Sequence, residues 1–476
     1  MTYPMKQYGV TQRMQQPSGE STHRSTSTRA VRWLVALTTL FAPALIAYHG
    51  YQLWSQSSEI QSRLKQISAR ALPVDNASLE QWNRSRNHDT QSALWAEILD
   101  LVEQHLISYP GLQKLPSLGQ TELPEVLDPN QPWQEVPHVT EYLQYARPIL
   151  DKLQQATQRP EPVWLPFEFR GFYTSSGYMH NFRSVMRLLA LEVEHALYHE
   201  DATRAMRGLH MMKNTSQSVP YPTSLVTKMI EDACEAGYQA AVARSLQVDL
   251  WTEAQLEELS QQLAPSEQLG PSENVVDQWR STWAGEQAMF AAHFGLSTDT
   301  QSEGLTVRRV GLARLQRVYL ELSEELQSMA TDDLSQLLGA AEKLEQSLIR
   351  RGHQPQSFDD MTFELLTPAV ASAAQTFVKR EDGRRQTSTA LGIKRYQKRF
   401  GKWPERLTDL TAIGHTAENW QTIRSGEFGY SSETDRAWLW SYRQDNRYEM
   451  VPEERPEEPS EDTEENQPSF RLILIR

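Results

Sequence analysis

The amino-acid sequence predicts a mainly α-helical protein with a transmembrane helix near its N-terminus, a multi-helix body with an αα-hairpin, and a small C-terminal α+β region with a short antiparallel sheet. Three observations support this prediction. Apolar residues recur at helical spacing over most of the chain, an uncharged apolar stretch follows a group of arginines, and the last residues alternate apolar and polar side chains as strands do. The expected domains are a polar basic tail (1–30), the transmembrane helix (31–54), a stalk helix with proline-rich loops (55–165), a helical body (166–300), long helices (305–400) and the α+β module (401–476).

The composition limits the size of the protein and the partners it can take. With 476 residues, of which 39% are hydrophobic, the chain can form roughly two to four domains with real cores. Its net charge of −14 argues against a nucleic-acid partner, which would require a basic surface. Cys234 is the only cysteine, so an intrachain disulfide and a cysteine-based zinc site are excluded. Because it lies in the apolar-rich run 225–246, we expect it to be a small buried helix residue.

The predicted membrane segment begins after a basic tail. Residues 1–32 contain one acidic residue, Glu20, and end in three arginines, Arg24, Arg29 and Arg32. Residues 33–54 carry no Asp, Glu, Lys or Arg, and a helix over them would be ~33 Å long, which matches a hydrocarbon core of ~30 Å. Because basic residues stay on the cytoplasmic side, we expect a single-pass cell-membrane protein with a cytoplasmic N-terminus and most of the chain outside the cytoplasm.

Aromatic residues lie at both ends of this segment. Trp33 stands at one end, and Tyr48, Tyr51 and Trp54 stand at the other, where the two bilayer interfaces favour amphipathic rings. The alternative is a cleaved signal peptide with its apolar stretch at 33–41 and its cleavage site after the small residues 42–44. The chain stays apolar beyond residue 44 and the leading polar region is long, so the sequence favours an anchor that contacts membrane lipid through residues 33–54.

Helices and proline-rich loops alternate in the next part of the chain. Apolar residues at helical spacing predict a helix over 78–109 and a shorter one over 140–155. Prolines interrupt residues 110–137, so we expect an extended surface loop there. Residues 160–173 are rich in proline and aromatic residues and fit an extended segment laid over the core.

The clearest helical pattern starts near Gly177. Apolar residues form one face from Phe182 to Leu197, and a second helix follows through Leu209, with Asp201 as its expected N-cap. These two helices would form an αα-hairpin. Further helices are expected at 222–246, 252–263, 275–294, 312–329, 332–350 and 363–400, where Asp382-Gly383 could divide the last one.

The sequence changes character after residue 400. Gly401 can cap the preceding helix and Pro404 suits the first turn of a new one, in which Leu407 and Leu410 form the buried stripe. Alternating patterns predict strands at 428–430, 437–442 and 470–475. The acidic, proline-interrupted residues 452–468 are typical of a solvated loop.

The run from Tyr396 to Leu410 reads Tyr-x4-Gly-x-Trp-Pro-x2-Leu-x2-Leu. It resembles a module of uncharacterised bacterial envelope proteins that combine one N-terminal membrane helix, a long α-helical body and a small terminal sheet. The run is also similar to the segment after the long helix in type II secretion pseudopilins, although those proteins start their membrane helix with Phe-Thr-Leu-x-Glu, which this chain lacks. The resemblance covers residues 385–442 in its motif and the whole chain in its layout, and it implies an architecture rather than an activity.

The best candidate for a metal site lies in the helix that starts near Gly177. Glu192, His195 and His199 are three and four residues apart, so they share a helix face and could offer one carboxylate and two imidazoles to an ion. The alternative interpretation is the polar flank of an amphipathic helix. Di-iron bundles need a second Glu-x-x-His pair, and the other one here, Glu135 to His138, lies in a proline-broken loop.

No motif assigns a reaction to the chain. Gly-x-Ser-x-Gly, Gly-x-Gly-x-x-Gly and Gly-x4-Gly-Lys are all absent from the sequence, so we predict no cofactor and name no catalytic residue. We therefore expect a non-enzymatic scaffold or interaction module of the cell envelope that has protein partners and no nucleic-acid partner. Two alternatives stay open: a metal-dependent enzyme that uses Glu192, His195 and His199, and a pseudopilin-like assembly component.

Overall fold

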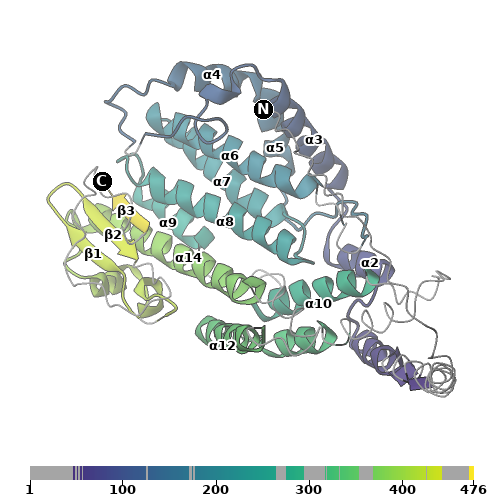
Figure 1. The fold of residues 1–476 in the computed structure, drawn as a ribbon. Helices are drawn as coiled ribbons and strands as arrows, with labels where there is room; N and C mark the ends of the chain where they lie inside the picture. Colours follow the sequence, from purple (N-terminus) through teal and green to yellow (C-terminus); the bar gives the residue numbers. More distant parts are fainter. Residues whose placement is uncertain are drawn as a thin grey trace, which may run out of the picture.

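The computed structural model describes residues 47–48, 51, 54–55, 57–124, 127–170, 174, 177–263, 275–293, 317, 319–331, 333–352, 368–424, 426–441 and 471–475. In these residues the protein is mainly α-helical, with one small antiparallel sheet near the C-terminus (Figure 1). The mainly helical fold class and the terminal sheet are therefore confirmed. The loop 452–468 lies outside the described residues.

The first half of the chain forms a helical body. Its elements are α2 (Asn76–Arg86), α3 (Ser92–Ser108), η1 (Leu112–Lys114), α4 (Val136–Tyr145), α5 (Arg147–Ala156), α6 (Gly177–Tyr198), α7 (Ala202–Ser218), α8 (Leu225–Ser245) and α9 (Glu253–Leu263).

Two expected helices are each divided in two. The helix expected at 78–109 stops at Asn87, which is extended at φ −121° and ψ 150°, and the one expected at 140–155 breaks before Pro148, because proline has no backbone N–H to continue a helix.

The αα-hairpin predicted after Gly177 is confirmed by α6 and α7. The chain reverses at Glu200, whose φ is +55°. The amide of Asp201 donates to the Ala196 carbonyl at 2.9 Å, and the amide of Glu200 donates to the Leu197 carbonyl at 3.0 Å, which is a Schellman ending of α6. The Asp201 side chain then accepts from the Arg204 amide at 3.0 Å, as expected of an N-cap.

The second half adds α10 (Val275–His293), a helix at 319–328, α12 (Leu334–Gly352) and α14 (Pro368–Phe400). The helix α14 is continuous through Asp382-Gly383, so the break considered there does not occur. Instead, the Asp382 carboxylate accepts from the Ile423 amide at 2.8 Å and ties α14 to the C-terminal module.

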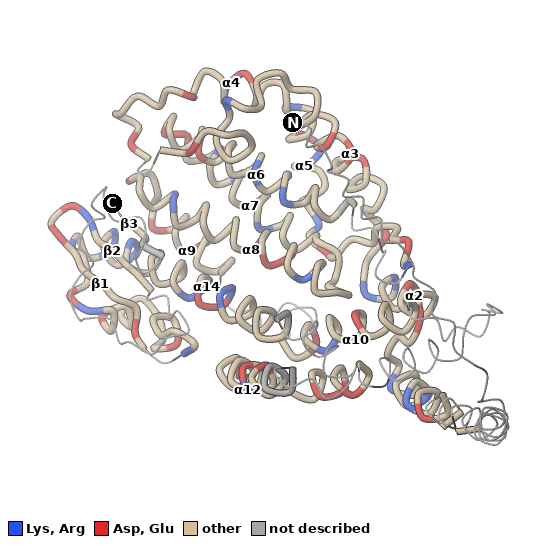
Figure 2. The backbone as a smooth tube through the Cα atoms, in the orientation of Figure 1, with Lys and Arg blue, Asp and Glu red and all other residues tan. Residues whose placement is uncertain are grey.

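The buried apolar residues form two main cores. The first core lies among α3 to α9, the C-terminal half of α14 and the sheet. The second core lies among α10, the helix 319–328, α12 and the N-terminal half of α14. Because α14 contributes to both, it connects the two parts of the body, as its course in Figure 1 shows. Charged residues of both signs are interspersed along the body in the view of Figure 2.

A close approach of backbones joins α10 to the loop before α8. A Cβ atom added at Gly285 would lie 1.7 Å from the carbonyl oxygen of Thr223. Only glycine allows this contact, which brings an element of the second core against one of the first.

The C-terminal module packs on α14 and contains η3 (Leu407–Ile413), η4 (Ala417–Trp420) and strands β1 (Gly429–Ser432), β2 (Ala437–Ser441) and β3 (Arg471–Ile475). The strands pair antiparallel in the order β1-β2-β3, with Ser431 opposite Trp438 and Trp438 opposite Leu474.

The motif from Tyr396 to Leu410 forms the corner between α14 and this module. Gly401 has a φ of +69° and its amide donates to the Gln397 carbonyl at 2.9 Å, so the predicted glycine cap is confirmed. Leu407 and Leu410 are buried as expected. They lie in a 3₁₀ helix that begins at Leu407, so the expected helix start at Pro404 is wrong. The Pro404 carbonyl accepts from the Tyr430 hydroxyl at 2.9 Å.

Within the described residues, no helix combines the length and apolar character needed to cross a bilayer. Residues 31–46, which make up most of the predicted transmembrane helix, lie outside the described residues. At its C-terminal end, Tyr48, Tyr51 and Trp54 are described as helical and are 59%, 63% and 69% exposed.

Candidate functional site

The predicted metal residue Glu192 lies on α6 and is bound by an arginine of α7. The Arg204 guanidinium donates to both carboxylate oxygens, from Nε at 2.6 Å and from Nη2 at 2.5 Å. The Glu192 side chain is 7% exposed, so this is a buried, bidentate ion pair. A metal ion bound to Glu192 would have to replace a cation that is already there.

Both ring nitrogens of His195 also have partners. Arg204 Nη1 lies 3.0 Å from Nδ1, which must accept because guanidinium only donates. The Nε2–H therefore donates to Thr140 Oγ1 at 2.8 Å, and that hydroxyl donates to the Val136 carbonyl at 2.8 Å. Burial, together with Arg204 and His199, lowers the pKa of His195 to about 4, so the imidazole is neutral near pH 7.

The third predicted ligand, His199, lies one turn further along the helix. Its ring centroid is 4.5 Å from that of His195, so the two histidines are close together as the spacing predicts. In the described residues, however, no group of three or more His, Cys, Asp and Glu side chains is arranged to hold an ion. The contacts around Glu192 and His195 thus favour the interpretation of a polar helix flank, and the metal site stays a prediction.

Cys234 lies on α8 and is completely buried, as expected of a small helix residue. Burial and the nearby carboxylates of Glu231 and Glu235 raise the pKa of its thiol. A thiol in this environment stays protonated and inaccessible, so it is not a reactive nucleophile.

The sequence analysis did not identify a buried cluster of charges where α8 meets α14. Lys228 Nζ lies 3.0 Å from Glu231 and also pairs with Asp232, while Arg380 Nη1 lies 3.3 Å from Glu231 and 3.4 Å from Asp232. Gln278 of α10 completes the cluster by donating to Glu231 at 3.3 Å. Lys228 and Asp232 are 2% and 4% exposed, which is rare for charged groups and requires such pairing.

The two acids of this cluster titrate differently. Burial raises the pKa of Asp232, although Lys228 and Arg380 oppose the shift. Burial also acts on Glu231, but there the same two cations outweigh it and lower the pKa. The spacing of Lys228, Glu231 and Asp232 at i, i+3 and i+4 was the available signal, since it puts all three on one helix face inside an apolar-rich run.

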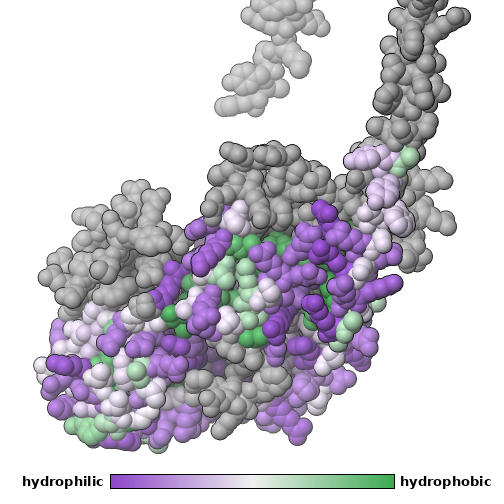
Figure 3. Space-filling view, turned by 90° about the horizontal axis from the view of Figure 1, so that it is seen from below, coloured by the Kyte–Doolittle hydropathy of each residue, from purple (hydrophilic) through white to green (hydrophobic). Residues whose placement is uncertain are grey.

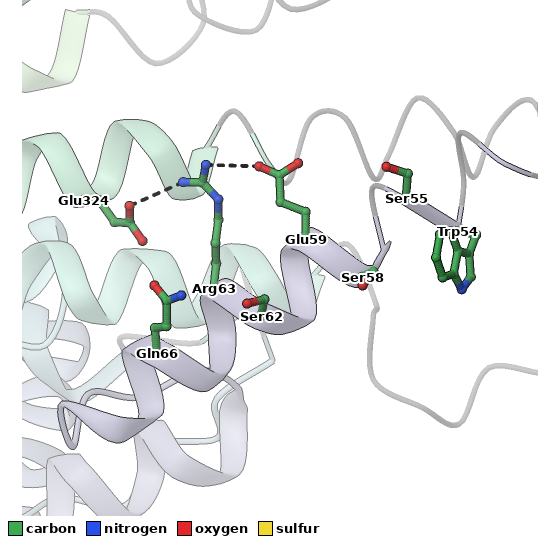
Figure 4. Close-up of a pocket in the computed structure, with 8 residues that line it drawn as sticks. All are labelled: Trp54, Ser55, Ser58, Glu59, Ser62, Arg63, Gln66 and Glu324. Carbon is green, nitrogen blue, oxygen red and sulfur yellow. Dashed lines mark hydrogen bonds and ion pairs between the residues drawn. The ribbon is translucent and has the colours of Figure 1, made fainter.

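A groove of about 610 Å³ lies beside the helix at 57–69, which follows the predicted membrane segment. It is lined by Trp54, Ser55, Ser58, Glu59, Ser62, Arg63, Gln66 and Glu324. Figure 4 shows the Arg63 guanidinium between Glu59 of its own helix and Glu324 of the helix 319–328. Because Arg63 is already bound by carboxylates, the lining residues that the structure describes offer no unpaired cation to an anionic ligand.

Comparison with known proteins assigns no family to this chain: no family model, no curated protein and no solved structure matches it.

Proposed function

We propose that this protein is a single-pass, membrane-anchored helical protein of a bacterial cell envelope that works by contact, as a scaffold or interaction module. The observation that carries the proposal is the exposure of Tyr48, Tyr51 and Trp54, which are 59%, 63% and 69% exposed. They follow directly on the uncharged residues 33–47. Large aromatic rings are costly to leave in water and are favoured at the interface between lipid and water.

The helix 57–69 supports the same proposal, because it connects this aromatic segment to the body. Ile60 and Ile67 pack against Leu320, so an anchor in the bilayer would hold the body close to the membrane surface. The net charge of −14 argues against a nucleic-acid partner, so we propose that the partners are proteins. On the one face that Figure 3 shows, hydrophilic residues cover most of the described part and hydrophobic ones gather near its centre.

The contacts of the predicted metal residues show a structural role for them within the body. Glu192 and His195 are engaged by Arg204 and Thr140 and stabilise the packing of α4, α6 and α7. The metal-dependent enzyme and the pseudopilin-like component remain predictions, because no contact among the described residues favours either one.

Cysteine labelling tests the proposed topology. Cys234 is buried, so wild-type chain in intact cells serves as the unlabelled blank. We would introduce Thr90→Cys at an exposed position before α3, and Ser18→Cys in the basic tail, and treat cells with a membrane-impermeant maleimide. The expected result is that Thr90→Cys reacts in cells whose outer envelope has been opened but whose inner membrane is intact. Ser18→Cys should react only after lysis of that membrane.

The reverse labelling pattern, or recovery of the full chain in the soluble fraction, would contradict the proposal. Removal of residues 33–47 is the matched control, since it should move the protein to the soluble fraction while its body stays folded.

A further inference from the structure

The helix 57–69 is attached to the body by a contact that is separate from both main cores. Its buried apolar part consists of Ile60, Ile67 and Leu320, which are 0%, 2% and 0% exposed. These residues are continuous with neither the first nor the second core. The contact joins residues next to the predicted membrane segment to residues some 260 positions further along the chain, as the pair Arg63–Glu324 shows.

Charged residues complete this contact. Arg63 lies 3.1 Å from Glu59 and 3.3 Å from Glu324, the two pairs drawn in Figure 4, and 3.1 Å from Glu321. These four side chains are between 24% and 45% exposed. Arg317 adds two longer contacts, at 3.9 Å, to Glu59 and Glu321. Ion pairs with this exposure contribute little individually and are screened by salt, so the contact depends on the ionic conditions.

The helix 57–69 is bordered by an open groove and ends in a tight turn. The groove of about 610 Å³ leaves one side of the helix uncovered. At its end, the chain turns at Ala71, which has a φ of +58°, a conformation that residues other than glycine rarely adopt. The amide of Leu72 donates to the Ile67 carbonyl at 3.3 Å, so this turn is a single, well-defined corner between the helix and α2.

From this geometry we propose that the helix 57–69 is a releasable strap, held on the helix 319–328 by the small apolar contact of Ile60, Ile67 and Leu320 together with the ion pairs of Arg63, so that the apolar contact alone does not hold it. When those charges are screened or removed, the strap detaches and pivots at Ala71. A helix of this length spans about 20 Å, so its release changes how far the body can lie from the anchor. The strap is a property of the folded chain, and only its effect on the distance to the bilayer depends on the proposed membrane anchor.

The test is a distance measurement between two spin labels on the full-length protein in detergent solution. The labels are placed at the exposed positions Gln61→Cys and Ser328→Cys, while the buried Cys234 stays unlabelled. With Arg63 present at low salt we expect one narrow distance distribution. The variant Arg63→Glu is expected to add a longer and broader population, and so is a rise in salt to about 1 M, where the screening length falls to about 3 Å.

Two further variants make the result specific. Lys65→Glu changes the same charge at an exposed position of the same helix, and it should keep the narrow distribution. Combining Arg63→Glu with Glu321→Arg and Glu324→Arg exchanges the charges on the two helices, so the ion pairs can form again and the narrow distribution should return. An unchanged distance in Arg63→Glu, or loss of the thermal unfolding transition of the whole body in that variant, would overturn the proposal, since the contact would then be inert or part of the core.

This result is independent of the topology test. Labels that show release in a protein with the opposite membrane topology would support the strap and contradict the proposed orientation of the chain. The proposed topology combined with an unchanged label distance would support the anchor and contradict the strap.

Discussion

The role of a charged side chain in this protein is decided by its partner. Glu192, His195 and Arg204 illustrate this, because a carboxylate and an imidazole that could bind a metal are instead bound to a guanidinium. Arg204 holds the two residues in fixed orientations, and burial together with Arg204 lowers the pKa of His195, so the neutral form is favoured. The Glu-x-x-His spacing therefore does not by itself establish a metal site, because Arg204 already occupies the positions that a metal ion would need.

Removing Arg204 should be costly. In Arg204→Met the Glu192 carboxylate would be left buried without a counter-charge, and we expect a loss of about 3–5 kcal/mol in the free energy of unfolding, measured by urea denaturation. The matched control is Arg147→Met, because its pair with Asp151 is 59% and 58% exposed and should matter by less than about 1 kcal/mol. If Glu192→Leu combined with Arg204→Met fails to recover most of the loss, the buried charge is not its cause.

Two buried histidines should make the stability depend on pH. Burial is the main cause that lowers the pKa of both His195 and His415 to about 4, from an ordinary value of 6.5. The unfolded chain then binds protons that the folded chain does not, so stability is fully present above about pH 6.5 and is lost as the pH falls towards 4. His195→Gln should flatten this dependence in urea unfolding between pH 7 and pH 4.

The exposed His88 gives the control for that experiment, and His88→Gln should keep the wild-type pH profile. A profile for His195→Gln that is parallel to the wild type would show that the imidazole is not held neutral.

At the scale of helices and corners, the chain ends two helices with residues that are not ideal for the purpose. Ala71 and Glu200 have φ values of +58° and +55°, where a Cβ atom is disfavoured. Each corner is nevertheless closed by the paired backbone hydrogen bonds of a Schellman ending. The surrounding apolar contacts and the N-cap at Asp201 therefore outweigh a local preference.

Glycine at these corners should relieve the strain. We expect Glu200→Gly to raise the midpoint of thermal unfolding, by the equivalent of up to about 1 kcal/mol, because the gain at positive φ exceeds the added flexibility of the unfolded chain. Ala190→Gly, in the middle of α6, is the control and should cost about 0.5–1 kcal/mol. Equal destabilisation by both variants would mean that the corner is not left-handed.

At the scale of the whole molecule, two cores are held together by α14, by the charges around Lys228 and Arg380, and by a close backbone contact. The charges at this junction are buried and paired, so they add directional contacts between helices that apolar packing alone would not specify. Gly285 lets α10 approach the loop before α8, and the two parts of the body meet there.

Gly285→Ala should therefore disturb the junction. An added methyl group would overlap the Thr223 carbonyl, which is backbone and cannot move away like a side chain, and we expect a loss of about 1–3 kcal/mol or more in unfolding free energy. Gly339→Ala in α12 is a matched control, since nothing lies within 4 Å of the added atom and the helix should gain up to about 1 kcal/mol. A neutral result for Gly285→Ala would mean that the backbones of Gly285 and Thr223 lie further apart than in this structure.

Local patterns predicted those features that depend on neighbours in the sequence. The helical spacing of α6 and α7, the cap at Asp201, the positive φ of Gly401 and the presence of strands β2 and β3 all depend on residues a few positions apart. The predicted alternation of buried and exposed residues does not hold in β2, where the first four residues are buried. The breaks at Asn87 and Ala146 were missed, because the apolar residues on the two sides of each break still fit one helical period. The polar residues 83–92 were the available signal for the first break. Pro148 was the available signal for the second break.

The sequence by itself determined that this is a mainly helical chain with a small terminal sheet, a buried cysteine and an αα-hairpin, because these follow from period, turn chemistry and burial. Only the tertiary structure decided which charges meet. Arg204 reaches Glu192, Arg380 reaches Asp232 and Arg63 reaches Glu324 because separate helices pack side by side, and the last two pairs are 148 and 261 residues apart. Electrostatic interaction acts through space, and the order of residues along the chain does not specify that distance.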